Sequence, residues 1–262
     1  MPPQRILIIG GGSAGWMTAS LLLHSLGRHG SKITLIESGN IPTIGVGEGT
    51  TPLFKRFLNY LGITETEFMS ACNATIKAGI NFPGWTGSEE FSTYFHPFDA
   101  PGYHQYQQQF FHHCDLRRKG LNADTAPGNY FFNAELAAQY RAPAGPPPCD
   151  ATKIDYAYHF DTGLLADFLK KRCLIGGVGH ILDNVTEVVQ KDNGDISHIV
   201  TANGGKLSAD FFVDCTGFAK LLIGKTLGTK IISYKPRLFN DRAIVIRTPD
   251  AGQEAPVISS DE

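Results

Sequence analysis

The apolar residues among the first 40 positions form a continuous run, then a helical spacing, then a second run. This order predicts a strand, a helix and a second strand. Residues 5–9 (RILII) are nearly all apolar, as expected for a strand that is buried on both faces. Residues 16–26 predict a helix, and residues 32–37 predict a second strand that ends on an acid, Glu37. The apolar positions that give the helical spacing are Met17, Leu21, Leu22 and Leu26. The chain therefore opens with a complete βαβ unit.

The next segment predicts two helices and a strand. Residues 53–61 have a helical pattern, and so do residues 64–72, where Thr64 is the expected N-cap and Glu67 follows three positions later. Residues 76–82 alternate as a strand. One face of this strand would carry Ile76, Ala78, Ile80 and Phe82, and the other Lys77, Gly79 and Asn81.

The second half predicts a helix followed by a β-meander. Asp161 is the expected cap of a helix that runs to Leu174 and places Leu164, Leu165, Phe168 and Leu169 on one face. Strands are expected at 180–190, 196–202 and 206–213, joined by the glycine-containing turns 192–194 and 203–205, and again at 243–247.

The middle of the chain has no clear period. Residues 85–150 are rich in aromatic residues, Gln and His, and four prolines at 142–149 indicate a surface linker. We therefore expect three regions, residues 1–84, 85–150 and 151–262, the second being an inserted segment that faces the substrate.

Composition excludes several classes of partner. The 262 residues are 42% hydrophobic and 18% charged, and the net charge of −2 gives no electrostatic case for binding nucleic acid or an anionic membrane. No apolar run approaches the roughly 20 residues of a membrane span. Five cysteines without a C-x-x-C pair predict a reduced, cytoplasmic protein.

A glycine motif follows the first predicted strand and opens the first predicted helix. Gly10, Gly12 and Gly15 form G-x-G-x-x-G, which allows a tight turn and close approach of the backbone to a diphosphate at the helix N-terminus. Glu37 lies 22 residues after Gly15, where an acid would bind a ribose hydroxyl and repel the 2′-phosphate of NADP. The motif predicts a dinucleotide site that also includes Ser13, Ala14 and Trp16.

The order of elements after the βαβ unit favours FAD over NAD. The chain builds other structure, adds the meander and returns through an apolar strand to Asp214-Cys215-Thr216-Gly217. This order is similar to FAD enzymes of the p-hydroxybenzoate hydroxylase type. The expected fold is α/β, with an FAD-binding Rossmann-like βαβ core, a three-stranded β-meander and an inserted substrate-facing segment. Taken alone, Asp214 is equally well interpreted as an ordinary residue at a strand end.

Four motifs together resemble the flavin-dependent halogenases of the tryptophan halogenase family. They are the run from Gly10 to Met17, the loop Gly45-Val46-Gly47-Glu48-Gly49-Thr50-Thr51-Pro52, Lys77 ahead of Phe82-x-Gly84-Trp85, and His159-Phe160-Asp161. The similarity extends in register over essentially the whole chain. One departure is Gly49, where the family usually has alanine, and in a loop we expect this change to be tolerated.

The resemblance implies roles for particular residues. Lys77 would be the catalytic lysine, although its spacing alone favours a lysine on a solvent-exposed sheet face. His96 and Phe98 would sandwich an aromatic substrate, an interpretation we weigh equally with ordinary loop residues. No metal site is expected, because His112-His113-Cys114 lacks distant partner ligands. The expected cofactor set is Gly10, Gly12, Ser13, Ala14, Gly15, Trp16, Glu37, Gly45, Val46, Gly47, Glu48, Val185, Asp214 and Gly217.

The activity implied is halogenation of an electron-rich, indole-like aromatic compound such as tryptophan. Reduced FAD from a separate NADH-dependent flavin reductase, oxygen and chloride or bromide would give hypohalous acid, which Lys77 would hold and deliver. A homodimer is left open. Family members are longer and carry a Trp-x-Trp-x-Ile-Pro motif, whereas the tryptophans here are Trp16 and Trp85, so we expect a fragment or a shortened form. Two alternatives remain, an FAD-dependent aromatic hydroxylase and an inactive truncated flavin-binding protein.

Overall fold

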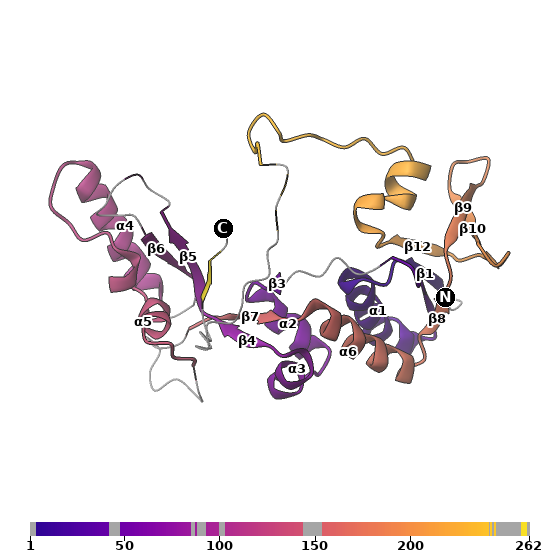
Figure 1. The fold of residues 1–262 in the computed structure, drawn as a ribbon, viewed down its shortest axis with the longest axis horizontal. Coiled ribbons are helices and arrows are strands. Elements are labelled where there is room, and N and C mark those ends of the chain that lie inside the picture. Colours follow the sequence, from indigo (N-terminus) through magenta and orange to yellow (C-terminus); the bar gives the residue numbers. More distant parts are fainter. Residues whose placement is uncertain are drawn as a thin grey trace. The chain divides into compact units, whose positions relative to one another are not determined.

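The chain folds into two compact units. The computed structural model describes residues 4–41, 48–84, 87, 93–99, 103–143, 154–240, 242 and 244, and the backbone of 258–260. The first unit contains Met1–Val46 and Asp161–Arg247, and the second contains Gly47–Phe160 and Thr248–Glu262 (Figure 1). Each unit contains β-sheets of its own.

A four-stranded parallel sheet forms the centre of the first unit. Its strands lie in the order β12-β1-β2-β8. They are β1 (Arg5–Ile9), β2 (Lys32–Glu37), β8 (Gly179–Leu182) and β12 (Phe211–Asp214). Ile8 and Leu35 are fully buried, as the apolar runs predict for strands covered on both faces. The predicted βαβ unit is confirmed.

Helices α1 (Ser13–Ser25) and α6 (Thr162–Ile175) pack against each other, and α1 also packs on β1 and β2 (Figure 1). The predicted helix at 16–26 begins three residues earlier, and its predicted apolar face is wrong. Its buried side chains include Trp16, Ala19 and Ser20, whereas Leu21 is 37% exposed. Small residues on the buried side let α1 approach its neighbours closely, so apolar spacing alone misplaces the face.

The cap of α6 is confirmed. The carboxylate of Asp161 accepts a hydrogen bond of 2.9 Å from the backbone N–H of Leu164. Leu165 and Leu169 are fully buried, as predicted, and Leu164 and Phe168 are half-buried.

The three-stranded meander is present, but two of its predicted strands are each divided in two. The meander consists of β9 (Val185–Gln190), β10 (Ile196–Thr201) and β11 (Lys206–Leu207), in the order β11-β10-β9. The predicted strand 180–190 is β8 followed by β9, and the predicted strand 206–213 is β11 followed by β12. The carboxylate of Asp183 accepts hydrogen bonds from the backbone of Asn184 and Asn203 and turns the chain between β8 and β9.

The first sheet of the second unit has the order β3-β7-β4. It contains β3 (Glu48–Gly49), β7 (Ala157–Phe160) and β4 (Thr75–Lys77), all antiparallel. Helices α2 (Leu53–Tyr60) and α3 (Glu65–Cys72) contribute aromatic side chains to one face. Phe54 stacks on Phe160 with ring centroids 5.8 Å apart, and Phe68 meets Tyr158 edge-on at 5.1 Å. The Thr64 cap of α3 is confirmed by a 3.2 Å hydrogen bond from Glu67 N–H.

The second sheet of this unit corrects the predicted strand at 76–82. The chain breaks at Ala78, so β4 is followed by a separate strand, β5 (Gly79–Pro83). Strand β5 pairs with β6 (Thr93–Pro97) and with β13 (Ile258–Ser260).

The region 85–150 also contains two helices, α4 (His104–Arg118) and α5 (Phe132–Ala138), which the sequence did not predict. No side chain of α4 is fully buried, which explains why it lacks a helical apolar stripe. The predicted linker at 142–149 and the predicted strand at 243–247 lie mostly outside the described residues.

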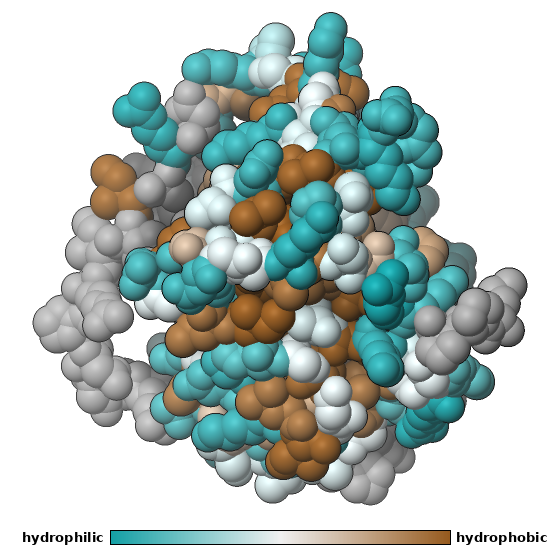
Figure 2. Space-filling model, turned by 90° about the vertical axis from the view of Figure 1, so that its right-hand side faces the viewer, coloured by the Kyte–Doolittle hydropathy of each residue, from teal (hydrophilic) through white to brown (hydrophobic). Residues whose placement is uncertain are grey.

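Within the described residues, no helix combines the length and apolar character needed to cross a membrane. Figure 2 views the molecule from the side on which β9 and β10 lie in Figure 1. On that face, brown apolar groups are broken up by teal polar groups and do not form one continuous apolar surface.

Candidate functional site

The turn between β1 and α1 is closed too tightly for side chains. Gly10 has φ +110°, and a Cβ placed there would lie 2.2 Å from the carbonyl oxygen of Cys215. A Cβ on Gly15 would lie 1.9 Å from the carbonyl oxygen of Gly10. The turn therefore leaves no room for side chains at these glycines, and the absence of side chains lets a diphosphate approach the backbone closely.

The N-terminus of α1 offers unsatisfied donors at this turn. Gly12 occupies the cap position without a side-chain hydrogen bond, and the first turn carries no acidic residue. The buried hydroxyl of Ser13 makes no hydrogen bond to any part of the chain that the structure describes. Free N–H groups, the helix dipole and an unused hydroxyl favour an anion at this point, so the residues present fit the diphosphate of FAD.

Glu37 lies directly against the glycine turn, and a lysine and a histidine hold it there. Its Oε1 accepts hydrogen bonds from Lys170 Nζ at 2.7 Å and His180 Nε2 at 2.8 Å. A Cβ on Gly11 would lie 1.6 Å from Oε2. The acid is therefore at the position expected for a ribose ligand, with one oxygen already fixed by protein donors.

Trp16 is buried and contributes to the structure around Glu37. It is 1% exposed, its ring centroid lies 5.6 Å from that of His180, and Lys170 Nζ lies 5.5 Å from its ring centre. Its side chain thus supports the two donors of Glu37.

Asp214 organises the second predicted turn through its own hydrogen bonds. Oδ1 accepts from Thr216 N–H and Oγ1, and Oδ2 accepts from the N–H groups of Leu222 and Ile223 at 2.8 and 2.9 Å. Burial alone would raise the pKa of this carboxyl, but these hydrogen bonds outweigh burial and hold the pKa below its ordinary value of 3.8. The turn continues through Gly217, which has φ +58°.

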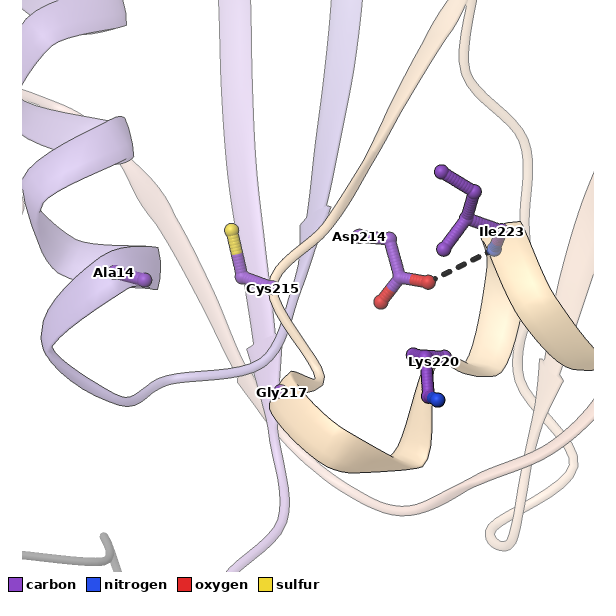
Figure 3. Close-up of a pocket in the computed structure, with 6 residues that line it drawn as sticks. All are labelled: Ala14, Asp214, Cys215, Gly217, Lys220 and Ile223. Atoms are coloured by element: carbon purple, nitrogen blue, oxygen red, sulfur yellow. Dashed lines mark hydrogen bonds between the residues drawn. The ribbon is translucent and has the colours of Figure 1, made fainter. Parts of the chain in front are cut away.

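A pocket of about 220 Å³ lies between this turn and the first turn of α1. Figure 3 shows Ala14 and Cys215 on one side and the carboxylate of Asp214 bonded to Ile223 on the other. Gly217 and Lys220 complete the lining. The two glycine-containing turns predicted from sequence therefore share one pocket in the first unit.

Three members of the expected cofactor set, Gly45, Val46 and Gly47, lie outside the described residues. Glu48 is half-buried and begins β3 in the second unit. Val185 begins β9 and packs on the apolar cluster that contains Ile9 and Ile36.

Lys77 is buried in the second unit. It is 6% exposed, and its ammonium makes no hydrogen bond or ion pair with any residue in the described ranges. The solvent-exposed placement that spacing alone favours is therefore wrong. A lysine this deeply buried is ordinarily paired, so an unpaired one indicates a place for a ligand.

The pairing of the strands defines which residues share the face with Lys77. Lys77 is opposite Ala157, and His159, two residues further along β7, is opposite Gly49. Directly opposed residues point to the same side of a sheet, as do residues two apart in one strand. We call this side, formed by Gly49, Lys77, Ala157 and His159, the lysine face. The other side carries Tyr158 and Phe160 and is closed by the aromatic cluster.

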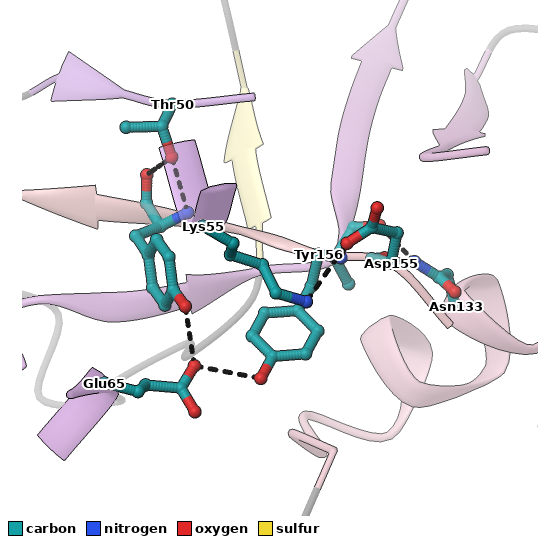
Figure 4. Close-up of polar contacts among 8 residues, drawn as sticks. Thr50, Lys55, Glu65, Asn133, Asp155 and Tyr156 are labelled. Carbon is teal, nitrogen blue, oxygen red and sulfur yellow. Dashed lines mark hydrogen bonds and ion pairs between the residues drawn. The ribbon is translucent and has the colours of Figure 1, made fainter. Parts of the chain in front are cut away.

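A polar network holds the backbone at Ala78, the residue after Lys77. Figure 4 shows part of this network, in which Asn133 is hydrogen-bonded to Asp155. Asn133 is fully buried, and its Nδ2 donates to the carbonyl oxygens of Ala78 at 2.7 Å and Asp155 at 2.9 Å. Its Oδ1 accepts from the hydroxyl of Tyr103. Burial raises the pKa of Tyr103 to about 12, so this hydroxyl keeps its proton. Asn133 thus satisfies the carbonyl oxygen of Ala78, the residue at which the predicted strand is interrupted.

A second part of the network fixes the start of β7. The carboxylate of Glu65 accepts hydrogen bonds from Tyr156 at 2.9 Å and Tyr158 at 2.7 Å, and Lys55 forms an ion pair with Asp155 at 3.1 Å (Figure 4). Burial, followed by the hydrogen bond to Glu65, raises the pKa of Tyr158 well above its ordinary range.

His96 and Phe98 meet in one aromatic pocket of about 520 Å³ in the second unit. The other aromatic side chains that line it are Tyr94, Phe95, Tyr103, Phe110, Phe111 and Phe131. Strand β6, which carries His96, pairs with β5 immediately after the Lys77-Ala78 break. The two predicted substrate residues therefore border a pocket of a size suited to one aromatic ring system.

His112-His113-Cys114 does not form a metal cluster. The ring of His113 contacts the hydroxyl of Tyr130 at 2.5 Å. In the described parts of the chain, no group of three His, Cys, Asp or Glu residues is placed to hold a metal ion.

Sequence reasoning missed Lys170, His180 and Asn133. Each is a single polar residue without a motif, and each acquires its role from a partner more than 50 positions away in the chain.

The parallel sheet, the glycine turn and the acid that ends β2 are features of the dinucleotide-binding type of α/β fold. Residues 5–261 match the model of the family described as tryptophan halogenase. The chain belongs to the tryptophan halogenase family.

Characterised relatives give the same result. The chain is 36% identical to the tryptophan 6-halogenase SttH of Streptomyces toxytricini, over 94% of this chain and 50% of that protein. It is 36% identical to the tryptophan 7-halogenase RebH of Lentzea aerocolonigenes, over 94% of this chain and 48% of that protein. The chain thus spans about half the length of the curated relatives that it matches.

Solved structures agree with the sequence matches. The structure of a tryptophan halogenase from Shewanella frigidimarina superposes with a TM-score of 0.77 at 32% identity, covering 92% of this chain and 47% of that one. Xcc4156, a flavin-dependent halogenase from Xanthomonas campestris, gives a TM-score of 0.74 at 38% identity, covering 87% and 45%.

Proposed function

We propose that this chain carries the flavin-binding and lysine-bearing parts of a flavin-dependent halogenase that acts on an electron-rich, indole-like aromatic compound. The observation that carries the proposal is Lys77, a buried residue whose ammonium has no partner in the described chain, on a sheet face that has small residues beside it. Such a group suits a small, neutral, reactive ligand that can accept a hydrogen bond, as hypohalous acid can.

The glycine turn at Gly10–Gly15, which includes the first turn of α1, and Glu37 together form what we call the cradle, and this part of the first unit would hold FAD. The first turn of α1 would bind the diphosphate, and Glu37 would accept a hydrogen bond from a ribose hydroxyl. Once bound in its reduced form, supplied by a separate NADH-dependent flavin reductase, the cofactor would give two electrons to oxygen, and the oxygen would take two more from chloride or bromide to yield hypohalous acid and water.

Lys77 would hold and aim the resulting hypohalous acid. Its ammonium donates a hydrogen bond to the oxygen of the acid and makes the halogen more electrophilic. The ring carbon forms a bond to halogen, the oxygen–halogen bond breaks, and the oxygen leaves as water with one proton from the ammonium. The ring then loses its proton, which restores the charge balance, and the net change is ArH + HOX → ArX + H2O. Burial restricts competing attack by water and thiols.

The aromatic pocket would hold the substrate ring. His96 and Phe98 both line it, and their rings can stack on an indole. The same reaction class would apply to free tryptophan or to a related indole, because the side chains that line the pocket are mostly aromatic and would contact the ring that both compounds share.

The test replaces Lys77 by methionine, which preserves length and burial but removes the ammonium. The control is Lys119→Met at the end of α4, where Lys119 forms an exposed i,i+4 pair with Asp115. With reductase, NADH, FAD and bromide, we expect Lys77→Met to lose about a hundredfold or more of its brominated product, and the control to lose little.

Flavin binding separates this outcome from misfolding. We expect both variants to bind FAD as the unmodified chain does, because Lys77 is not part of the cradle. Bromination that persists in Lys77→Met would overturn the role of the lysine. A hydroxylated product in place of a brominated one would favour the monooxygenase alternative.

A further inference from the structure

The lysine face contains two positions at which the side chain is very small. Ala157, the residue opposite Lys77 on the central strand β7, is fully buried. Gly49, on β3, has no side chain and is opposite His159. A lysine at the edge strand β4 can therefore extend across β7 over the alanine and reach β3.

The ammonium of Lys77 ends beside the Cα of Gly49. A Cβ placed on Gly49 would lie 2.7 Å from Nζ of Lys77, and 3.2 and 3.3 Å from Cε1 and Nδ1 of His159. The first distance is shorter than a carbon–nitrogen contact permits, and the other two are tight. The space taken by the ammonium is the space that a methyl group at position 49 would need.

We infer that Gly49 is a positioning residue for Lys77: the absence of a side chain at Gly49 creates the seat in which the ammonium lies, and thereby sets the direction from which Lys77 presents hypohalous acid. This inference rests on the proposed role of Lys77. It also changes the sequence-based expectation for Gly49, which treated glycine in place of the family's usual alanine as a neutral loop substitution: beside an alanine, the lysine would lie in a different position from the one that Lys77 takes here. The residue belongs to a strand, and its Cα faces the lysine.

Alanine at position 49 would move the ammonium without rebuilding the fold. The group in conflict with the new methyl is the far end of a flexible side chain, which can rotate away, and the ring of His159 needs to give by only a few tenths of an ångström. We therefore expect Gly49→Ala to fold, with Lys77 displaced from its seat and more accessible to solvent.

The test measures Lys77 directly. The unmodified chain, Gly49→Ala and the control Gly128→Ala are treated with a limiting amount of acetic anhydride, and acetylation of Lys77 is followed by peptide mass spectrometry relative to Lys119. Gly128 also lies in the second unit, but its added Cβ would have an ordinary contact of 3.7 Å with Ala134. We expect Lys77 in Gly49→Ala to be acetylated at least about fivefold faster than Lys77 in the unmodified chain. This ratio corresponds to the lower end of the free-energy cost of overpacking a well-packed site. Equal rates in the two glycine variants would overturn the inference.

A double-mutant cycle keeps the inference testable if Gly49→Ala is destabilised but still folds. The fall in melting temperature caused by Gly49→Ala should be larger with Lys77 present than in a Lys77→Ala background, where the conflicting ammonium is gone. An equal fall in both backgrounds would overturn the inference.

A bromination assay on the same variants shows which proposal fails. If the cycle and the acetylation rates behave as expected but no variant brominates an indole, the seat for Lys77 stands and the proposed function fails. If the unmodified chain brominates and Gly49→Ala gives the same turnover and the same ratio of product isomers, the inference fails by itself. We expect the isomer ratio or kcat to change, with KM for the indole nearly unchanged, because the pocket of His96 and Phe98 is not altered.

Discussion

The cradle in the first unit and the lysine face in the second differ in which part of the chain carries the chemistry. In the proposed cradle, the backbone would carry the chemistry through closed glycine turns and the N–H groups at the start of α1. On the lysine face one side chain would carry it, and residues without a functional group of their own, such as Gly49 and Ala157, lie beside that side chain. A backbone site should fail when the turn is widened, whereas a side-chain site should fail when the surrounding space changes.

The largest effect is expected where a side chain is added to the cradle. In Gly15→Ala the new Cβ would lie 1.9 Å from the carbonyl oxygen of Gly10, so the turn must open. We expect a loss of about 3 kcal/mol in the free energy of unfolding and no measurable FAD binding. Urea unfolding and flavin fluorescence titration measure the two effects.

A glycine elsewhere in the same unit provides the control. Gly39→Ala would place a Cβ 3.6 Å from Leu182, which is an ordinary contact, and should change stability by less than about 0.5 kcal/mol. Similar losses in both variants would show that the tight turn is not the cause.

The same difference between backbone and side-chain sites explains how much could be predicted from sequence. The cradle is nearly contiguous, and its glycine spacing, strand and terminal acid were all predicted and found. The lysine face was predicted only in part: Gly49, Lys77 and His159 lie in three separate motifs, and no sequence pattern indicates that β3, β4 and β7 bring them to one face of a sheet. The break at Ala78 illustrates the limit, since a buried amide 55 positions away takes the carbonyl that would have continued the strand.

The meander and α1 show the same limit for the fold. The alternating pattern located strands at 180–190 and 206–213, but the division of each into two strands depends on Asp183 and on pairing with β1 and β2. In α1, close packing by Ala19 and Ser20 determined the buried face, and the larger leucines did not.

An intermediate effect is expected at the one part of the cradle that does depend on side chains. Lys170→Met removes one of the two donors that fix Glu37, so the acid should become mobile and FAD binding should weaken by about tenfold. Lys171→Met is the matched control, because Lys171 is the next residue of α6 and is exposed. Riboflavin, which lacks the adenosine ribose, should bind both variants equally well. An equal loss for riboflavin would show that Lys170 does not act through Glu37.

The smallest effect is expected at the Asp214 turn, and it should depend on pH. Because hydrogen bonds hold the pKa of Asp214 below 3.8 in the folded state, its contribution to stability is present above pH 3.8 and is lost as the pH falls through the lower folded value. Asp214→Asn cannot accept all four hydrogen bonds and should cost about 1 kcal/mol at pH 7. The difference from the unmodified chain should shrink below pH 4 in denaturant titrations. A difference that stays constant between pH 7 and 3 would show that the charge is not involved.

The most direct test of the whole account is mass spectrometry of indoles incubated with this chain, FAD, a flavin reductase, NADH and bromide. The account predicts the bromine isotope doublet in at least one indole, dependent on both reductase and bromide. A product that has gained oxygen without bromine, or unchanged indoles in the presence of bound and reduced flavin, would contradict it.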